Sequence, residues 1–101
     1  MIARVWHGWT KAVNASAYEE MLRSEIFPGI TARGINGYRG AELFLRPDGD
    51  EVEFMTVLRF DSMEGVQAFA GKDQARPVIH PKAEQLLIRM DERARHYRIA
   101  T

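Results

Sequence analysis

The chain has 101 residues, of which 46% are hydrophobic and 28% charged, and its 14 Lys and Arg balance its 14 Asp and Glu. This length and composition predict one folded domain over residues 1–101, and the balanced charge argues against a nucleic-acid partner. Cysteine is absent, which excludes disulfides and thiolate chemistry. No apolar run is long enough for a signal peptide or a membrane span, so we expect a cytoplasmic protein with no membrane partner.

The opening stretch "IARVWHGW" is rich in β-forming residues and lacks a helical repeat of apolar positions. We therefore predict a strand over residues 2–9. Because neighbouring residues of a strand point to opposite faces, Trp6 shares a face with Arg4, and His7 and Trp9 lie on the other. Either face could be the one that meets the helices, and the spacing leaves this open.

The next stretch, "NASAYEEMLRSEIFPG", repeats apolar side chains at helical spacing. Asn14 or Ser16 can cap the start of this helix, and Pro28 followed by Gly29 predicts its end. Tyr18 and Tyr38 could each offer a phenolic hydroxyl to a ligand, but Tyr18 falls on the apolar side of the helix, where core packing is its expected role.

Two further strands are predicted over residues 37–46, "GYRGAELFLR", and residues 51–60, "EVEFMTVLRF", with a tight turn at "PDG" between them. In the second strand the even-numbered residues are the more apolar, so that face should meet the helices. Three strand arginines could hold a phenolate or carboxylate if they faced the pocket: Arg4, Arg39 and Arg59. Their expected role is pairing with Glu42, Glu51 and Glu53 on the sheet surface.

The second half of the chain begins with "SMEGVQAFAG", which predicts a helix with Phe69 on its apolar side. After an irregular stretch, "HPKAEQLL" predicts a short helix with Pro81 at its first position and His80 just before it. The ending "ERARHYRIAT" predicts a last strand that carries His96.

The order β-α-β-β-α-β is that of a ferredoxin-like fold. It predicts an α+β protein with one four-stranded antiparallel sheet and two helices on one face. The other face is left without cover. Because a second copy would cover that face and protect the edge strands, we expect a homodimer.

Three segments resemble a known family in their order and lengths: "MIARVWHGWT", "YRGAELFLRPDGDEVEFMTVLRFDSMEGVQAFAG" and "ARHYRI". They are similar to the antibiotic biosynthesis monooxygenase-like proteins of the dimeric α/β-barrel group. The resemblance implies a homodimer whose sheets pack into a barrel, with a pocket in each subunit between sheet and helices. Characterised relatives include cofactor-independent monooxygenases, which deprotonate a phenolic substrate that then reacts with oxygen, and heme-degrading enzymes.

The heme-degrading members of this family use an Asn on the first strand, a Trp, and an axial His on the second helix. This sequence has no Asn in its first predicted strand, and "SMEGVQAFAGKDQA" contains neither His nor Trp. The resemblance therefore does not extend to heme degradation.

The candidate catalytic residues are His96 and, after it, His7, because an imidazole titrates near neutral pH and can act as a general base. The residues predicted to contact the substrate are Trp6, Trp9, His80 and Phe69. Structural roles are open for all of them: the aromatic rings can fill the core or the dimer interface, and His80 can cap the short helix. No metal is expected, because the histidines lack the spacing of a metal site. No nucleotide cofactor is expected, because "GINGYRG" precedes a strand rather than a helix.

These observations predict a cofactor-independent monooxygenase that acts on a small aromatic molecule, such as a phenol, quinol or anthrone. The alternative is a non-catalytic dimeric domain of the same fold that binds small molecules or takes part in a stress response. A histidine within hydrogen-bond reach of a cavity lined by tryptophan would favour the enzyme.

Overall fold

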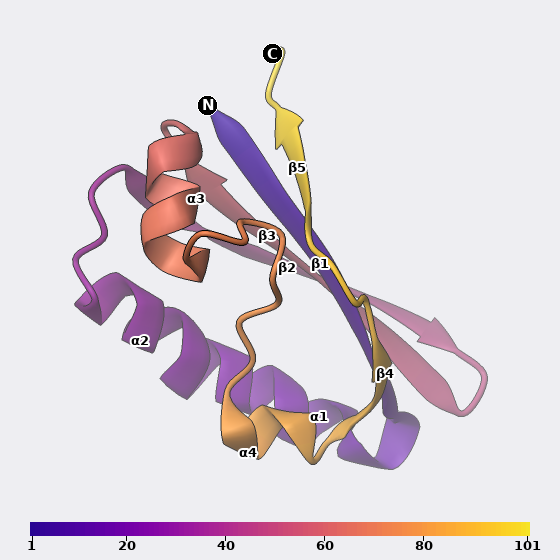
Figure 1. Cartoon of the computed structure of the whole chain (residues 1–101). Coiled ribbons are helices and arrows are strands. Elements are labelled where there is room, and N and C mark those ends of the chain that lie inside the picture. The colour runs from indigo at the N-terminus through magenta and orange to yellow at the C-terminus, as the bar shows by residue number, and fades with distance from the viewer.

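A computed structural model describes residues 1–101 and shows an antiparallel sheet with all helices on one face (Figure 1). The elements in chain order are β1 (Ile2–Lys11), α1 (Ala12–Met21), the π-helical turn η1 (Leu22–Ile26), α2 (Phe27–Ala32), β2 (Tyr38–Asp48), β3 (Glu51–Phe60), α3 (Met63–Ala70), α4 (Pro81–Glu84), β4 (Leu87–Met90) and β5 (Arg95–Arg98). The strand order is β2-β3-β1-β4, and β5 also pairs with β1. This is the predicted α+β, ferredoxin-like arrangement.

The sheet has one strand more than predicted. β4 pairs with residues 8–10 of β1, and β5 pairs with residues 2–5 of β1. The two short strands therefore lie end to end along one edge of β1, where a single last strand was predicted. The sequence does not reveal β4, because four residues shortly after a short helix are too few to show an alternating pattern.

The first helix begins at Ala12, earlier than predicted, and its N-cap is Lys11. Neither Asn14 nor Ser16 caps it. Instead, the Ala12 N–H donates to the Asp50 carbonyl at 2.7 Å. A contact with the β2–β3 turn thus replaces the side-chain cap that the sequence predicted.

The prediction that Pro28 and Gly29 end the first helix is wrong. The chain passes through η1, where the Phe27 N–H bonds the Leu22 carbonyl five residues back, and then continues as α2. Pro28 lies in the first turn of α2. A proline is tolerated there because the π-helical turn has already replaced the regular i to i−4 bonding that Pro28 would break.

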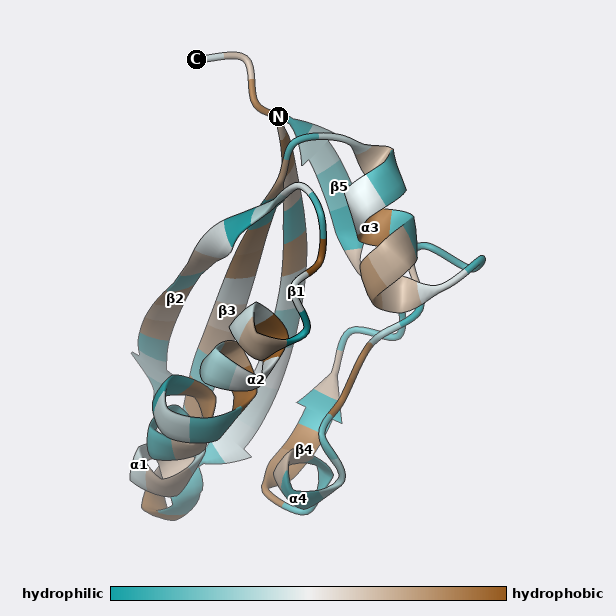
Figure 2. Ribbon diagram, turned by 90° about the vertical axis from the view of Figure 1, so that its left-hand side faces the viewer, coloured by the Kyte–Doolittle hydropathy of each residue, from teal (hydrophilic) through white to brown (hydrophobic).

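The prediction for the apolar face of β3 is confirmed. Phe54 and Phe60 are fully buried, and Val52 and Leu58 are less than a tenth exposed. Figure 2 shows the hydrophobic residues of β3 as brown bands along the strand. The first helix packs on one half of this face and α3 on the other, which leaves a space between them under the segment that joins α3 to α4.

The opposite face of the sheet carries no helix (Figure 1). Its central side chains are all partly exposed: Val5, His7, Trp9, Met55 and Val57. None of the helices has the length and apolar character that a membrane crossing requires.

Candidate functional site

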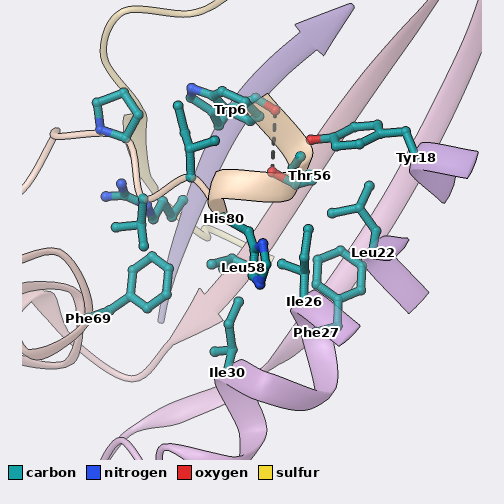
Figure 3. Close-up of a pocket in the computed structure, with 15 residues that line it drawn as sticks. Trp6, Tyr18, Leu22, Ile26, Phe27, Ile30, Thr56, Leu58, Phe69 and His80 are labelled. Atoms are coloured by element: carbon teal, nitrogen blue, oxygen red, sulfur yellow. Dashed lines mark hydrogen bonds between the residues drawn. The ribbon is translucent and has the colours of Figure 1, made fainter. Parts of the chain in front are cut away.

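A pocket lies between the sheet and the helices, below the irregular segment that leads into α4 (Figure 3). Its lining is mostly hydrophobic and comprises Arg4, Trp6, Tyr18, Leu22, Ile26, Phe27, Ile30, Thr56, Leu58, Phe69, Pro77, Val78, Ile79, His80 and Ala83. The cavity has a volume of about 60 Å³, and a more open hollow of about 200 Å³ adjoins it. Ligand pockets usually have about 300–1,000 Å³. Side chains therefore fill much of the space that a ligand would occupy.

Trp6 is the tryptophan that faces this pocket, together with Arg4. Its indole N–H donates to the Asp91 carbonyl at 2.9 Å, which fixes the ring. Gly8 follows on the same face of β1. A Cβ atom at Gly8 would stand 3.2 Å from two carbons of the Trp6 ring and 2.8 Å from Leu87 Cδ2. The glycine in "WHGW" is thus what lets the indole lie along the strand and form the pocket wall.

Tyr18 contributes both to the core and to the pocket. Its side chain is 2% exposed, and its ring meets Phe54 edge-on with centroids 4.7 Å apart. Its hydroxyl is directed into the pocket, where it forms no hydrogen bond with the other lining residues (Figure 3). Burial raises the pKa of Tyr18 to about 12, so the phenol stays neutral and can donate a hydrogen bond to a ligand. The sequence made core packing the expected role of Tyr18 and left its hydrogen-bonding role open, because helical spacing does not show where the hydroxyl ends.

Arg4 is buried, with 3% exposure, and it faces the helices rather than the sheet surface. Its guanidinium donates to the carbonyls of Gln74 and Arg76, the latter at 2.6 Å, and to His96 Nε2 at 2.9 Å. Burial, with a smaller contribution from the charge of Arg76, lowers the pKa of Arg4 to about 10. The prediction that Arg4 pairs with a glutamate on the sheet surface is wrong, because β1 turns Arg4 toward the pocket.

The other two strand arginines do form surface ion pairs. Arg59 contacts Glu42 at 2.6 Å, as predicted. Arg39 instead contacts Asp61 at 2.6 Å. Both pairs are exposed and stabilise the fold little.

His96 lies directly behind Arg4, and it does not line the pocket. A guanidinium only donates hydrogen bonds, so His96 Nε2 must accept and the ring proton must sit on Nδ1. Burial, followed by the charge of Arg4, lowers the pKa of His96 below its usual value of 6.5. The imidazole is therefore held neutral, one hydrogen bond away from a residue of the pocket.

His7 and Trp9 lie on the uncovered face of the sheet and do not line the pocket, because β1 alternates its side chains. His7 Nδ1 is 2.7 Å from Asp91 Oδ2, and its Nε2 is 3.8 Å from Glu53 Oε2. Its ring stacks against Trp9, and the Arg89 guanidinium stands 4.7 Å from the Trp9 ring centroid. This arrangement separates both residues from any ligand bound between sheet and helices.

His80 and Phe69 both line the pocket and the adjoining hollow. His80 Nδ1 also accepts from the Lys82 N–H at 3.2 Å, so the predicted capping role of His80 is confirmed. No three His, Asp or Glu side chains are arranged to hold a metal ion.

Fold and pocket together define a ferredoxin-like α+β protein with a mostly apolar site between its sheet and its helices. No family model and no curated protein sequence matches the chain. Several solved structures, in contrast, superpose on it over nearly their full length. A candidate antibiotic biosynthesis monooxygenase from Bacillus cereus superposes with a TM-score of 0.67 and 14% identity, over 99% of this chain and 91% of that one.

The heme degrader MhuD from Mycobacterium tuberculosis, solved with two hemes in its active site, is equally similar. Its TM-score is 0.67 at 16% identity, over 100% of this chain and 97% of that one. A point variant of MhuD with two manganese protoporphyrin IX molecules per active site gives 0.62 at 17% identity, over 100% and 96% of the two chains. The chain therefore shares the ferredoxin-like fold of these structures, as the sequence resemblance predicted.

Proposed function

We propose that this protein is a cofactor-independent monooxygenase that binds a small aromatic phenol, quinol or anthrone between its sheet and its helices. The observation that carries the proposal is an apolar pocket with an indole wall and few polar groups, which is the usual composition of a site for a flat aromatic ligand. The MhuD structures, which hold porphyrins in their active sites, support ligand binding on this fold.

We assign the base to His96. A substrate hydroxyl that reaches Arg4 would displace His96 from the guanidinium, give its proton to the freed Nε2, and leave a phenolate paired with Arg4. The electron-rich anion then reacts with oxygen. For an anthrone the ring CH₂ becomes a carbonyl, one oxygen atom enters the product and the other leaves as water. The substrate supplies all four electrons, so the chemistry requires no cofactor.

Oxygen consumption by the metal-depleted protein, measured with anthrones and naphthoquinols against a protein-free control, tests this function. Uptake should exceed the control and fall about 100-fold or more in His96→Gln, because a general base contributes about 10²–10⁴ and glutamine keeps only the hydrogen bond. The matched control is Tyr97→Phe, a neighbour on β5 that is 52% exposed. Uptake that persists in His96→Gln would reject His96 as the base.

The pH dependence of oxygen uptake is a second test of His96 as the base. Only neutral His96 can accept a proton, and its pKa in the folded protein is lowered from 6.5 by burial and by Arg4. Uptake should therefore be retained at pH 6.5 and decline only at lower pH, as His96 becomes protonated. An acid limb centred above pH 6.5 would contradict the assignment.

The uncovered face of the sheet supports a homodimer. We propose that a second copy covers Val5, Met55 and Val57, and that His7 and Trp9 belong to this interface. Sedimentation equilibrium at micromolar concentration should give twice the mass of 11.6 kDa. A monomer at these concentrations would contradict the dimer, and would leave the pocket proposal unaffected.

The small cavity favours a second candidate function, a non-catalytic binding domain. At about 60 Å³ it holds no aromatic ring unless the segment above it moves. Ligand binding without oxygen uptake above the control, across the whole substrate panel, would favour this alternative.

A further inference from the structure

Three arginines surround the C-terminal end of α3, and none of them pairs with a carboxylate. Arg4, Arg33 and Arg76 all donate to backbone carbonyls of residues 68–76. The nearby Asp73 carboxylate forms its ion pair with Arg93, whose hydrogen bond is the main cause of the lowered pKa of Asp73. Arg76 makes only a minor contribution to lowering that pKa, so Asp73 offsets only part of the charge of Arg76. The partial negative charge of a helix C-terminus offsets only a fraction of three full positive charges.

Most other arginines of the chain are neutralised by an acidic partner: Arg23, Arg39, Arg46, Arg59, Arg89 and Arg93. Two more without one, Arg95 and Arg98, lie exposed on β5. The arginines around α3 are thus a local excess of positive charge in a chain of zero net charge. Of these three arginines, Arg4 destabilises the fold most, because its side chain is only 3% exposed and a buried charge without a counter-ion is unfavourable.

Two of these arginines stand beside an aromatic ring of the site. The Arg4 and Arg33 guanidinium carbons are 5.3 and 5.2 Å from the centroid of Phe69. Arg4 lines the pocket, Arg33 lines the adjoining hollow, and Phe69 lines both. The one acidic residue of the hollow, Glu25, is 4.0 Å from Lys82 Nζ.

From this arrangement we infer that the ligand of the site is an aromatic acid. Its carboxylate lies beside Phe69, where Arg33 and Arg4 supply the positive charge. Its ring lies between Phe69 and Trp6, in space that opens when the segment above the pocket moves. The ligand supplies the counter-ion that the protein itself does not. The inference rests on the proposed function only for the position of the pocket, since it concerns binding and not turnover.

Binding of 1-hydroxy-2-naphthoate and of its uncharged amide, followed by tryptophan fluorescence and calorimetry, tests the inference. The two probes share the ring and the hydroxyl, and the amide replaces the charged carboxylate by a neutral carboxamide of similar size. The acid should bind about 10-fold or more tighter than the amide, because an arginine–carboxylate pair is a strong, charge-assisted contact. Equal affinities would overturn the proposal.

Arg33→Gln should weaken binding of the acid about 10-fold and leave binding of the amide unchanged, and Arg33→Lys should recover part of the loss. Arg33 is exposed, so the variant should fold. Arg59→Gln removes an equal charge from an arginine outside the site and should change neither affinity. Acid binding that survives Arg33→Gln, or that falls as much in Arg59→Gln, would overturn the proposal.

The oxygen assay separates this inference from the proposed function. Preferential binding of the acid without oxygen uptake would support the acid site and reject the monooxygenase. Oxygen uptake with neutral anthrones, together with equal affinity for the acid and the amide, would support the monooxygenase and reject the acid site.

Discussion

Phe54→Ala is expected to lower the free energy of unfolding by about 3–5 kcal/mol, the range found when a buried phenylalanine is truncated. Phe54 has no exposed surface, and its ring packs edge-on against the ring of Tyr18. Domains of this size are stable by only about 5–15 kcal/mol, so the variant should be close to unfolding. The same change should release the Tyr18 ring from its position at the pocket.

Unfolding by guanidinium chloride, followed by circular dichroism at one fixed protein concentration, measures this loss of stability. Val13→Ala is the matched control, because Val13 is 84% exposed on α1 and its truncation should alter stability by less than about 0.5 kcal/mol. A loss below about 1 kcal/mol in Phe54→Ala would show that the core under the pocket is not packed as described.

Gly8→Val is expected to change the pocket wall and to destabilise the protein by about 1–3 kcal/mol, the usual cost of overpacking. The added side chain would meet the Trp6 ring and Leu87, so the indole must move and give up its hydrogen bond to Asp91. The emission maximum of tryptophan should shift, and affinity for aromatic ligands should fall.

Gly29→Ala is the control for this change. Nothing lies within 4 Å of a Cβ at Gly29, and the residue is helical. Alanine there should raise stability by about 0.5–1 kcal/mol and leave the emission spectrum unchanged. An unshifted spectrum in Gly8→Val would mean that the indole does not depend on Gly8 for its place.

The sequence predicted those parts of the fold that depend on local pattern. Alternation along β3 identified the buried face, and His80 before Pro81 identified the start of α4. The path of the first helix could not be predicted in this way. Pro28 and Gly29 are usual end signals, and only the π-helical turn before them lets the helix continue.

The candidate site was predictable only in part, for a similar reason. Trp6, Phe69 and His80 line the pocket. Aromatic and titratable side chains of this kind can be picked out as site candidates from the sequence alone. Arg4 was one of three strand arginines that could have faced the pocket, and a surface ion pair was its expected role. Its importance comes from Gln74, Arg76 and His96, which lie about 70 to 90 positions further along the chain and approach Arg4 only in the folded structure.

The π-helical turn also bears on how a site of this kind can diversify. Each residue of an α-helix turns the chain by about 100°, so loss of a single residue within Leu22–Ile26 would rotate everything after it by roughly that angle. Ile30, now one of the residues that line the pocket, would then point elsewhere, while the sheet and α3 stayed in place. Insertion or deletion of one codon here would therefore change which side chains line the pocket while the rest of the fold stayed the same.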